Sequence, residues 1–248
     1  MTPAEYYGFP EGAKVNFQYI NFYDSQEDNY PCPSNMDHAY SDEKRTVVKP
    51  RDTSNVTDMG SMFYYCENLT SIPPFDTGNV TRMYCMFYYC KSLTSIPPLD
   101  TSNVTSMEKM FYTCSALRTI PPLDTSNVTN MNDMFASCSL LRTIPPLQAS
   151  KVSFGSYNGP FSYGNMTNLK DFGGLIGLKS SLTNYGFEKC PNLTYESCIN
   201  ILNGLYDFTG NGQTPTSSQG KLKVHANFLT AVGDEIEIAT SRGWVISS

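Results

Sequence analysis

The side chains that most often carry catalysis are few and scattered in this chain. Its two histidines, His38 and His225, have no partner at metal-ligand spacing. The segment between Cys190 and Cys198 matches no common zinc or redox motif. There is no Gly-x-Ser-x-Gly nucleophile elbow, and the Gly-Asn-Gly run at 210–212 does not extend to a phosphate-binding fingerprint. The sequence therefore predicts no catalytic residue, no metal site and no cofactor, and we do not expect an enzyme.

The chemistry that remains is recognition by side chains that recur at a fixed interval. Two adjacent positions of a 24-residue repeat carry hydroxyl and guanidinium groups, and they supply these candidate ligand-binding residues: Thr70, Thr94, Arg118, Arg142, Ser71, Ser95, Thr119 and Thr143. Aromatic rings suit sugar or protein contacts, which adds Tyr64, Tyr88 and Tyr112, with Tyr65, Tyr84 and Tyr89 beside them. The alternative for the tyrosines is that several pack between helices and expose only their hydroxyls.

These columns arise because residues 52–147 contain four copies of the 24-residue unit, without gaps. Each copy reads Asp-Thr-(Ser/Gly)-Asn-Val-Thr, then Met, usually Met-Phe, then Cys, Leu, Ile-Pro-Pro and a final Leu or Phe. The fourth copy ends at Leu147, and an irregular fifth unit begins at Gln148. A fixed period of this length is typical of a stacked solenoid, in which each unit buries its apolar face against its neighbours.

Each copy predicts a short helix followed by a short strand. The apolar residues of the first copy have helical spacing: Val56, Met59, Met62, Phe63, Cys66 and Leu69. Thr57 can cap this helix, which must end before Pro73. Residues 69–72 then predict a strand that pairs in parallel with 93–96, about 4.8 Å away. The predicted fold class is α/β, with short parallel strands on one side, short helices on the other, and a cap at each end.

The polar and sulfur positions of the repeat each allow two interpretations. The repeated aspartates are Asp52, Asp76, Asp100 and Asp124. They either accept hydrogen bonds in tight turns or hold calcium. The Asn-Val-Thr sites are turn residues or glycan acceptors. One cysteine column predicts reduced, buried thiols and contains Cys66, Cys90, Cys114 and Cys138. The state of the others is open: Cys32, Cys85, Cys190 and Cys198.

The pattern Asp-Thr-Ser-Asn-Val-Thr-x-Met-x-x-Met-Phe-x-x-Cys-x-x-Leu resembles the BspA-like leucine-rich repeats of bacterial surface proteins. The resemblance covers residues 52–147 strongly and residues 45–200 in degraded form. It implies a leucine-rich-repeat solenoid with a role in adhesion or host-surface binding. Similar repeats occur in proteins of gut bacteria and their phages, so the resemblance fixes neither the ligand nor the carrier.

Changes in pattern divide the chain into a cap at 1–45, a regular solenoid at 46–147, degenerate repeats at 148–193 and a C-terminal cap at 194–248. The first part is rich in aromatic residues that can cover the first coil. The last part predicts a helix at 195–206 capped by Thr194, a strand at 222–224, a helix at 234–242 and a strand at 244–246. A polar loop over 209–220 lies between them.

The composition of the chain restricts the kinds of partner that we expect it to bind. The net charge is −6 and no basic cluster occurs in the sequence, which argues against nucleic acid. No apolar stretch approaches the roughly 20 residues of a membrane span, and the start lacks the features of a signal peptide. We expect a non-catalytic recognition or adhesion protein at a cell surface, outside the cell or on a virion, with a protein or glycan of a host or neighbouring cell as partner. The alternative is a structural spacer or assembly module of a larger adhesin or phage particle. The ligand and the oligomeric state are open.

Overall fold

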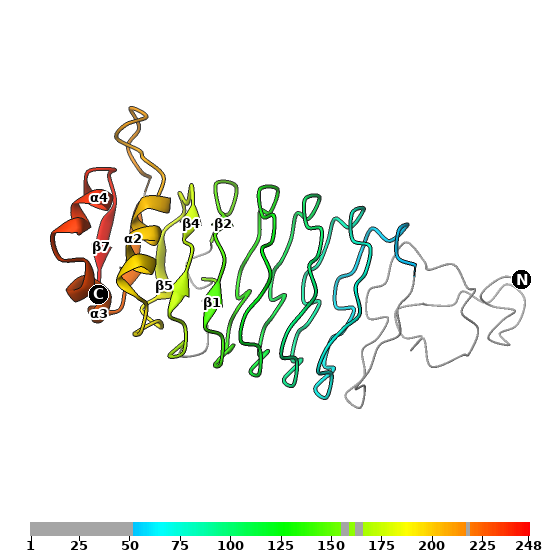
Figure 1. The fold of residues 1–248 in the computed structure, drawn as a ribbon. Helices are drawn as coiled ribbons and strands as arrows, with labels where there is room; N and C mark the ends of the chain where they lie inside the picture. The colour runs from blue at the N-terminus through cyan, green and yellow to red at the C-terminus, as the bar shows by residue number, and fades with distance from the viewer. Residues whose placement is uncertain (1–51, 155–158, 162–165, 217–218) are drawn as a thin grey trace, which may run out of the picture.

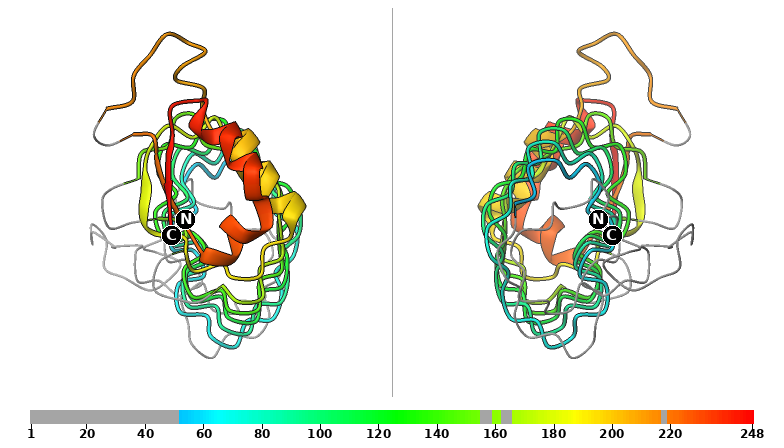
Figure 2. Two further views of the ribbon diagram at one scale, coloured as in Figure 1. Left: turned by 90° about the vertical axis from the view of Figure 1, so that its left-hand side faces the viewer. Right: turned by 90° about the vertical axis from the view of Figure 1, so that its right-hand side faces the viewer.

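The computed structural model describes residues 52–154, 159–161, 166–216 and 219–248. In this part of the chain, similar coils lie side by side in a row, and the C-terminal helices close one end of it (Figure 1). Seen along the row, the coils lie one behind another with nearly the same outline (Figure 2). The predicted N-terminal cap, including the aromatic residues of 1–45 and Cys32, lies outside the described residues.

Backbone hydrogen bonds join each coil to the next. The amide of Met59 donates to the carbonyl of Arg82 at 3.0 Å, and the amide of Phe63 donates to that of Met86 at 2.9 Å. In the other direction, the amide of Thr81 donates to the carbonyl of Thr57 at 2.8 Å. Residues one repeat apart therefore lie next to one another in parallel register, as the bridges Asp58↔Arg82, Arg82↔Ser106 and Ser106↔Asn130 also show.

The prediction of a short helix within each repeat was wrong. Residues 52–142 form turns and single bridges, with hydrogen bonds that span three residues, such as Cys66 N–H to Phe63 C=O at 3.1 Å. Two residues of each of the four regular coils have left-handed backbone, with φ of 51° at Ser61 and 60° at Tyr65 in the first. Left-handed residues interrupt a right-handed helix and direct their N–H groups away from its axis. Here those amides donate to the next coil, Ser61 to Tyr84 and Tyr65 to Tyr88, each at 2.8 Å.

Short parallel strands are confirmed, although only where the regular repeats end. Strand β1 (Thr143–Ile144) pairs in parallel with β3 (Asp171–Phe172), and β2 (Leu147–Gln148) pairs in parallel with β4 (Leu175–Ile176). Earlier coils are joined at the same positions by single contacts, such as the bridge Thr119↔Thr143. The register is therefore kept through the irregular fifth unit.

The predicted apolar stripe forms the core, although no helix carries it. All six of its residues in the first copy are buried, as are their counterparts in the later copies. Its phenylalanines stack along the row with centroid separations of 5.4, 5.6, 5.8 and 6.1 Å: Phe63, Phe87, Phe111, Phe135 and Phe161. Each coil therefore buries its apolar face against its two neighbours.

The C-terminal part has the helices and the longer strands. It contains β5 (Leu182–Phe187), α2 (Tyr195–Gly204), β6 (Lys221–Val224), α3 (Ala226–Val232), the 3₁₀ helix η2 (Gly233–Ile236), α4 (Glu237–Thr240) and β7 (Val245–Ser247). The strands form a parallel sheet in the order β5-β6-β7, which closes the row.

Most elements predicted for this part are confirmed with small changes at their ends. Helix α2 begins after Thr194, whose hydroxyl accepts from the amide of Ser197 as predicted for a cap. The predicted helix at 234–242 is instead η2 followed by α4, and it ends before Gly243, which has φ of 85°. The sequence analysis did not predict α3 or β5. None of the helices in the described residues is long and apolar enough to cross a membrane.

Candidate ligand-binding surface

The predicted strand-side residues do lie together on the surface. Arg118, Arg142, Thr70 and Thr94 are exposed, and Arg142 N–H donates to the carbonyl of Arg118 at 2.8 Å. Thr94 donates to the carbonyl of Thr70 from both its amide, at 3.2 Å, and its hydroxyl, at 3.3 Å. The adjacent hydroxyl column is exposed at its first three members and half-buried at the last: Ser71, Ser95, Thr119 and Thr143.

A further cation continues this surface. The amide of Lys170 donates to the carbonyl of Arg142 at 3.0 Å, and the register Thr143↔Asp171 places Lys170 beside Arg142. We call Arg118, Arg142 and Lys170 the basic column. Thr194 follows Lys170 in the same way, with an amide-to-carbonyl distance of 2.9 Å.

Sequence reasoning missed Lys170 because the irregular fifth unit breaks the 24-residue interval. A signal was present, since Leu-Lys-Asp-Phe at 169–172 has the same inward and outward pattern as Leu-Arg-Thr-Ile at 141–144. In both segments the first and last residues are buried, and the second residue, Arg142 or Lys170, is exposed.

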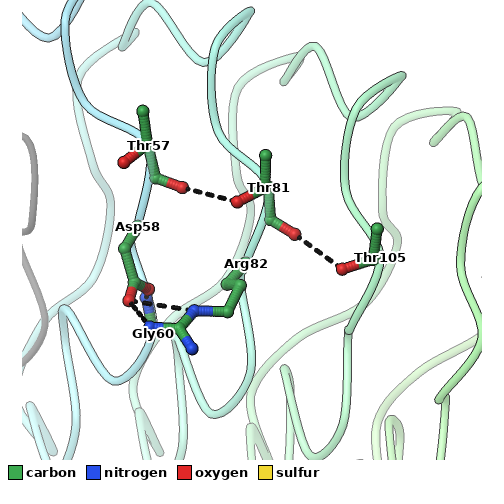
Figure 3. A network of polar contacts seen from close by, with 6 residues as sticks. All are labelled: Thr57, Asp58, Gly60, Thr81, Arg82 and Thr105. Atoms are coloured by element: carbon green, nitrogen blue, oxygen red, sulfur yellow. Dashed lines mark hydrogen bonds and ion pairs between the residues drawn. The ribbon is translucent and has the colours of Figure 1, made fainter.

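The basic column differs from the other cations of the coils. Arg82 donates its Nε–H to Asp58 Oδ2 at 3.0 Å (Figure 3), Lys91 pairs with Glu67 at 2.9 Å, and Lys109 pairs with Glu108 at 2.9 Å. Within the described ranges, by contrast, no ion pair involves Arg118, Arg142 or Lys170. The positive charge of the column is therefore available to a ligand.

The tyrosine candidates stack on one another. The rings of Tyr64 and Tyr88 are 4.7 Å apart and those of Tyr88 and Tyr112 are 4.8 Å apart, nearly parallel in both pairs. Tyr65 and Tyr89 form a second stack at 4.8 Å. We call these five residues the tyrosine ladder. They are half-buried between coils, so the alternative interpretation is closer to the structure than a set of open ring faces.

Burial and the neighbouring phenols raise the pKa of Tyr88, and burial raises that of Tyr64. These phenols therefore stay neutral at physiological pH and offer a partner ring edges and hydroxyl groups. One stack ends after Tyr112, since Ala136 takes the tyrosine position in the fourth coil, and the other ends after Tyr89, since Thr113 takes it in the third.

The threonines predicted as helix caps have another role. Thr81 Oγ1 donates to the carbonyl of Thr57 at 3.1 Å, and Thr105 Oγ1 donates to that of Thr81 at 3.2 Å (Figure 3). The Asn-Val-Thr asparagines act similarly, because the side-chain amide of Asn79 donates to the carbonyl of Ser54 at 2.7 Å and that of Asn103 to Gly78 at 2.8 Å. These side chains join successive coils, in agreement with the structural interpretation of the sites.

The repeated aspartates stabilise their own turns. Asp52 Oδ1 accepts from the amide of Ser54 at 3.0 Å, and Asp100 Oδ1 accepts from both the amide and the hydroxyl of Ser102. These hydrogen bonds lower the pKa of both carboxyl groups. Among the described residues, no group of three or more His, Cys, Asp and Glu side chains could hold a metal ion. The arrangement favours the turn interpretation over calcium.

The cysteine column is buried, as predicted, and its members are thiols and not disulfides. Three of these thiols donate to a carbonyl of the preceding coil, Cys90 Sγ to Phe63 at 3.1 Å, Cys114 Sγ to Phe87 at 3.0 Å and Cys138 Sγ to Phe111 at 2.9 Å. Burial raises the pKa of the Cys138 thiol to about 12, so it is an inert core group.

The cysteines outside the column that the structure describes are thiols and not disulfides. Cys190 and Cys198 are buried, which favours a core role over a disulfide, and Cys85 is half-buried. Burial raises the pKa of the Cys198 thiol to about 11.

Only one of the two histidines, His225, lies within the described residues. His225 Nδ1 accepts from the amide of Asn227 at 3.1 Å and caps α3, and His38 lies outside the described residues. What the described surface offers is a regular set of charged and hydroxyl groups.

Comparison with known proteins finds similarity to solved structures and to one family model. No curated protein matches. A crystal structure of a leucine-rich repeat protein from Bacteroides ovatus matches with 16% identity and a TM-score of 0.37 over 82% of this chain, which spans only 41% of the length of that protein. Residues 34–146 match the model of a family described as "Mycoplasma protein of unknown function, DUF285". The repeat region is thus similar to a family whose own description assigns no activity.

Proposed function

We propose that this chain is a non-catalytic recognition or adhesion protein, a BspA-like leucine-rich-repeat solenoid that presents its outer columns to a protein or glycan. The observation that carries the proposal is the basic column, in which Arg142 is hydrogen-bonded through its backbone to Arg118 on one side and to Lys170 on the other. Such an array keeps side chains at a fixed spacing on a rigid support, which limits the entropy lost on binding.

The inward and outward positions of a coil differ in how much their residues vary, and this difference favours binding over catalysis. Inward positions repeat almost without change and are buried, whereas the position of Thr70, Thr94, Arg118 and Arg142 is exposed and varies. A variable side chain on a constant support suits recognition, since specificity can change without loss of the fold. We place the protein at a cell surface, outside the cell or on a virion, where a host or neighbouring cell supplies the partner.

The test compares two surfaces of one protein. The double variant Arg118→Ala/Arg142→Ala removes the two arginines of the basic column. The double variant Tyr64→Ala/Tyr112→Ala alters the tyrosine ladder. Binding of each variant and of the unchanged chain is measured on immobilised panels of glycans and extracellular-matrix proteins, with circular dichroism as the check on folding. We expect the arginine variant alone to lose at least about tenfold in affinity. Unchanged affinity in that variant would place the site elsewhere.

The alternative function, a structural spacer or assembly module, has one observation in its favour. Strand β7 forms an edge of the C-terminal sheet, and its Val245 is 63% exposed. An exposed edge strand offers backbone groups to a further strand. Light scattering after size exclusion tests this reading, because a stable monomer with no affinity for co-occurring structural proteins would contradict it.

A further inference from the structure

The basic column is a local concentration of positive charge on an acidic protein. The chain has a net charge of −6, yet Arg118, Arg142 and Lys170 follow one another on three successive coils. Like charges this close repel one another, at a spacing of about 4.8 Å between hydrogen-bonded strands. A carboxylate of the same chain within reach would offset that repulsion by forming an ion pair, of the kind that Asp58 forms with Arg82.

No such relief is built into the column. Thr143 lies between the register positions of Thr119 and Asp171, and the residues that follow the two arginines are the hydroxyl residues Thr119 and Thr143. The one acidic neighbour in the register is Asp171, next to Lys170, and within the described residues it forms no ion pair either. The column is therefore suited to an external anion.

From this geometry, we propose that the ligand of the basic column is a linear acidic polysaccharide, which carries carboxylate or sulfate groups at regular intervals. This inference rests on the proposed function and adds the chemical class of the ligand. One cation per coil matches a polymer with a repeating charge, and the hydroxyl column beside it can exchange hydrogen bonds with sugar hydroxyls.

The same surface is poorly suited to nucleic acid. Single strands are held by aromatic side chains on which successive bases stack, in addition to positive charge. Among the described residues of the coils, the segments that carry the columns have the order Leu-x-x-Ile or Leu-x-x-Phe, and Phe172 is buried. One exposed ring lies near the column, that of Tyr195, which follows Thr194, is 52% exposed and donates its hydroxyl to Glu235 at 2.9 Å. A single ring does not supply a row of stacking rings, and three cations are fewer than the phosphate contacts of a typical nucleic-acid site.

The experiment uses the whole chain and two forms of one polymer. Polygalacturonate carries a carboxylate on every ring, and its fully methyl-esterified form is the neutral counterpart; heparin supplies sulfate groups and single-stranded DNA supplies phosphates. Affinity is measured by biolayer interferometry at several salt concentrations. We expect binding to polygalacturonate or heparin that weakens as salt rises, with weaker binding to the methyl ester and to DNA.

Matched variants assign the binding to the column. The triple variant Arg118→Gln/Arg142→Gln/Lys170→Gln should lose about tenfold or more in affinity. The triple variant Lys189→Gln/Lys221→Gln/Lys223→Gln removes the same charge elsewhere and should bind like the unchanged chain. Asp171→Asn removes the one opposing charge and should tighten binding by about twofold to threefold.

The outcomes separate this inference from the proposed function. If neither acidic polymer binds, or both triple variants lose affinity equally, or DNA binds as well as the polysaccharides, the ligand class is wrong. If a neutral glycan or a protein of the binding panel is held through Arg118 and Arg142 in that case, the proposed function still stands. If substitution of the column changes no binding of any kind, the basic column is not the binding site, and the observation that carries the proposed function is lost as well.

Discussion

The coils and helix α2 present the same apolar pattern and differ in backbone structure. In the first coil the buried residues Met59, Met62, Phe63 and Cys66 occupy positions i, i+3, i+4 and i+7, and in α2 the buried residues Cys198, Ile201 and Leu202 are spaced i, i+3 and i+4. The coil forms three-residue turns that hydrogen-bond to the next coil, whereas α2 satisfies its own amides. One spacing is thus compatible with two structures.

The difference shows what decides between them. The amide of a coil residue such as Phe63 donates to a carbonyl of the next coil, here that of Met86, so an internal helix bond is not needed. Helix α2 lies at the closed end of the row, packed against β3 and β4 on one side and α3 on the other. Its sequence contains Thr194 as a cap and no left-handed residue, and it forms a regular helix.

The largest expected effect comes from opening the stacked core in the middle of the coils. Phe111→Ala should destabilise the fold by about 4 kcal/mol, because it removes a ring stacked at 5.6 Å on Phe87 and at 5.8 Å on Phe135. Each coil contacts only its neighbours, so unfolding should also become less cooperative. The single tryptophan, Trp244, reports on the C-terminal part, and far-ultraviolet circular dichroism reports on the whole chain.

In urea, the Phe111→Ala chain should lose its circular-dichroism signal in part before its tryptophan signal changes. Phe111→Leu is the control and should cost about 1 kcal/mol. Coincident transitions at an unchanged midpoint would show that the coils do not depend on the stack.

A glycine substitution should have opposite signs in the two regions. Thr113 has φ of 60°, which is strained for a β-branched residue, so Thr113→Gly should stabilise the fold by about 0.5 to 1 kcal/mol. Asn200 lies within α2, where glycine is a poorer helix former, so Asn200→Gly should destabilise it by about 0.4 kcal/mol. Urea midpoints of the two variants measure both changes. A loss of stability in both would mean that the left-handed residues do not define the coil.

The smallest expected effect is an acid dependence of the turns. Two hydrogen bonds from Ser102 lower the pKa of Asp100 below its ordinary value of 3.8. The folded state therefore binds this proton less tightly than the unfolded state. The turn's contribution to stability is present above pH 3.8 and is lost as pH falls through the lowered pKa of the folded state.

Asp100→Asn keeps an oxygen acceptor in the turn and removes the titrating group. Below pH 3.8, thermal unfolding of the unchanged chain should shift with pH more steeply than that of the variant, and above that pH the two should have equal slopes. Equal slopes throughout the acid range would show that the turn hydrogen bonds do not distinguish the two charge states. The fifth unit already lacks such a group, since Gln148 takes the aspartate position.

The sequence alone determined the repeat, the inward and outward positions, the buried cysteine column and the cap and helix around Thr194. These follow from local chemistry and from a period that places equal residues at equal positions. It also placed Arg118 and Arg142 in one column, because they are one period apart.

Only the tertiary structure decided the backbone of the coils and the full extent of the basic column. Turns replaced helices because carbonyl acceptors on the neighbouring coil can satisfy amides that a sequence pattern assigns to a helix. Lys170 joined the column because hydrogen bonding to Arg142 restores the register after an irregular insertion. Both features depend on contacts between residues a full coil apart, which the spacing of apolar residues within one coil does not specify.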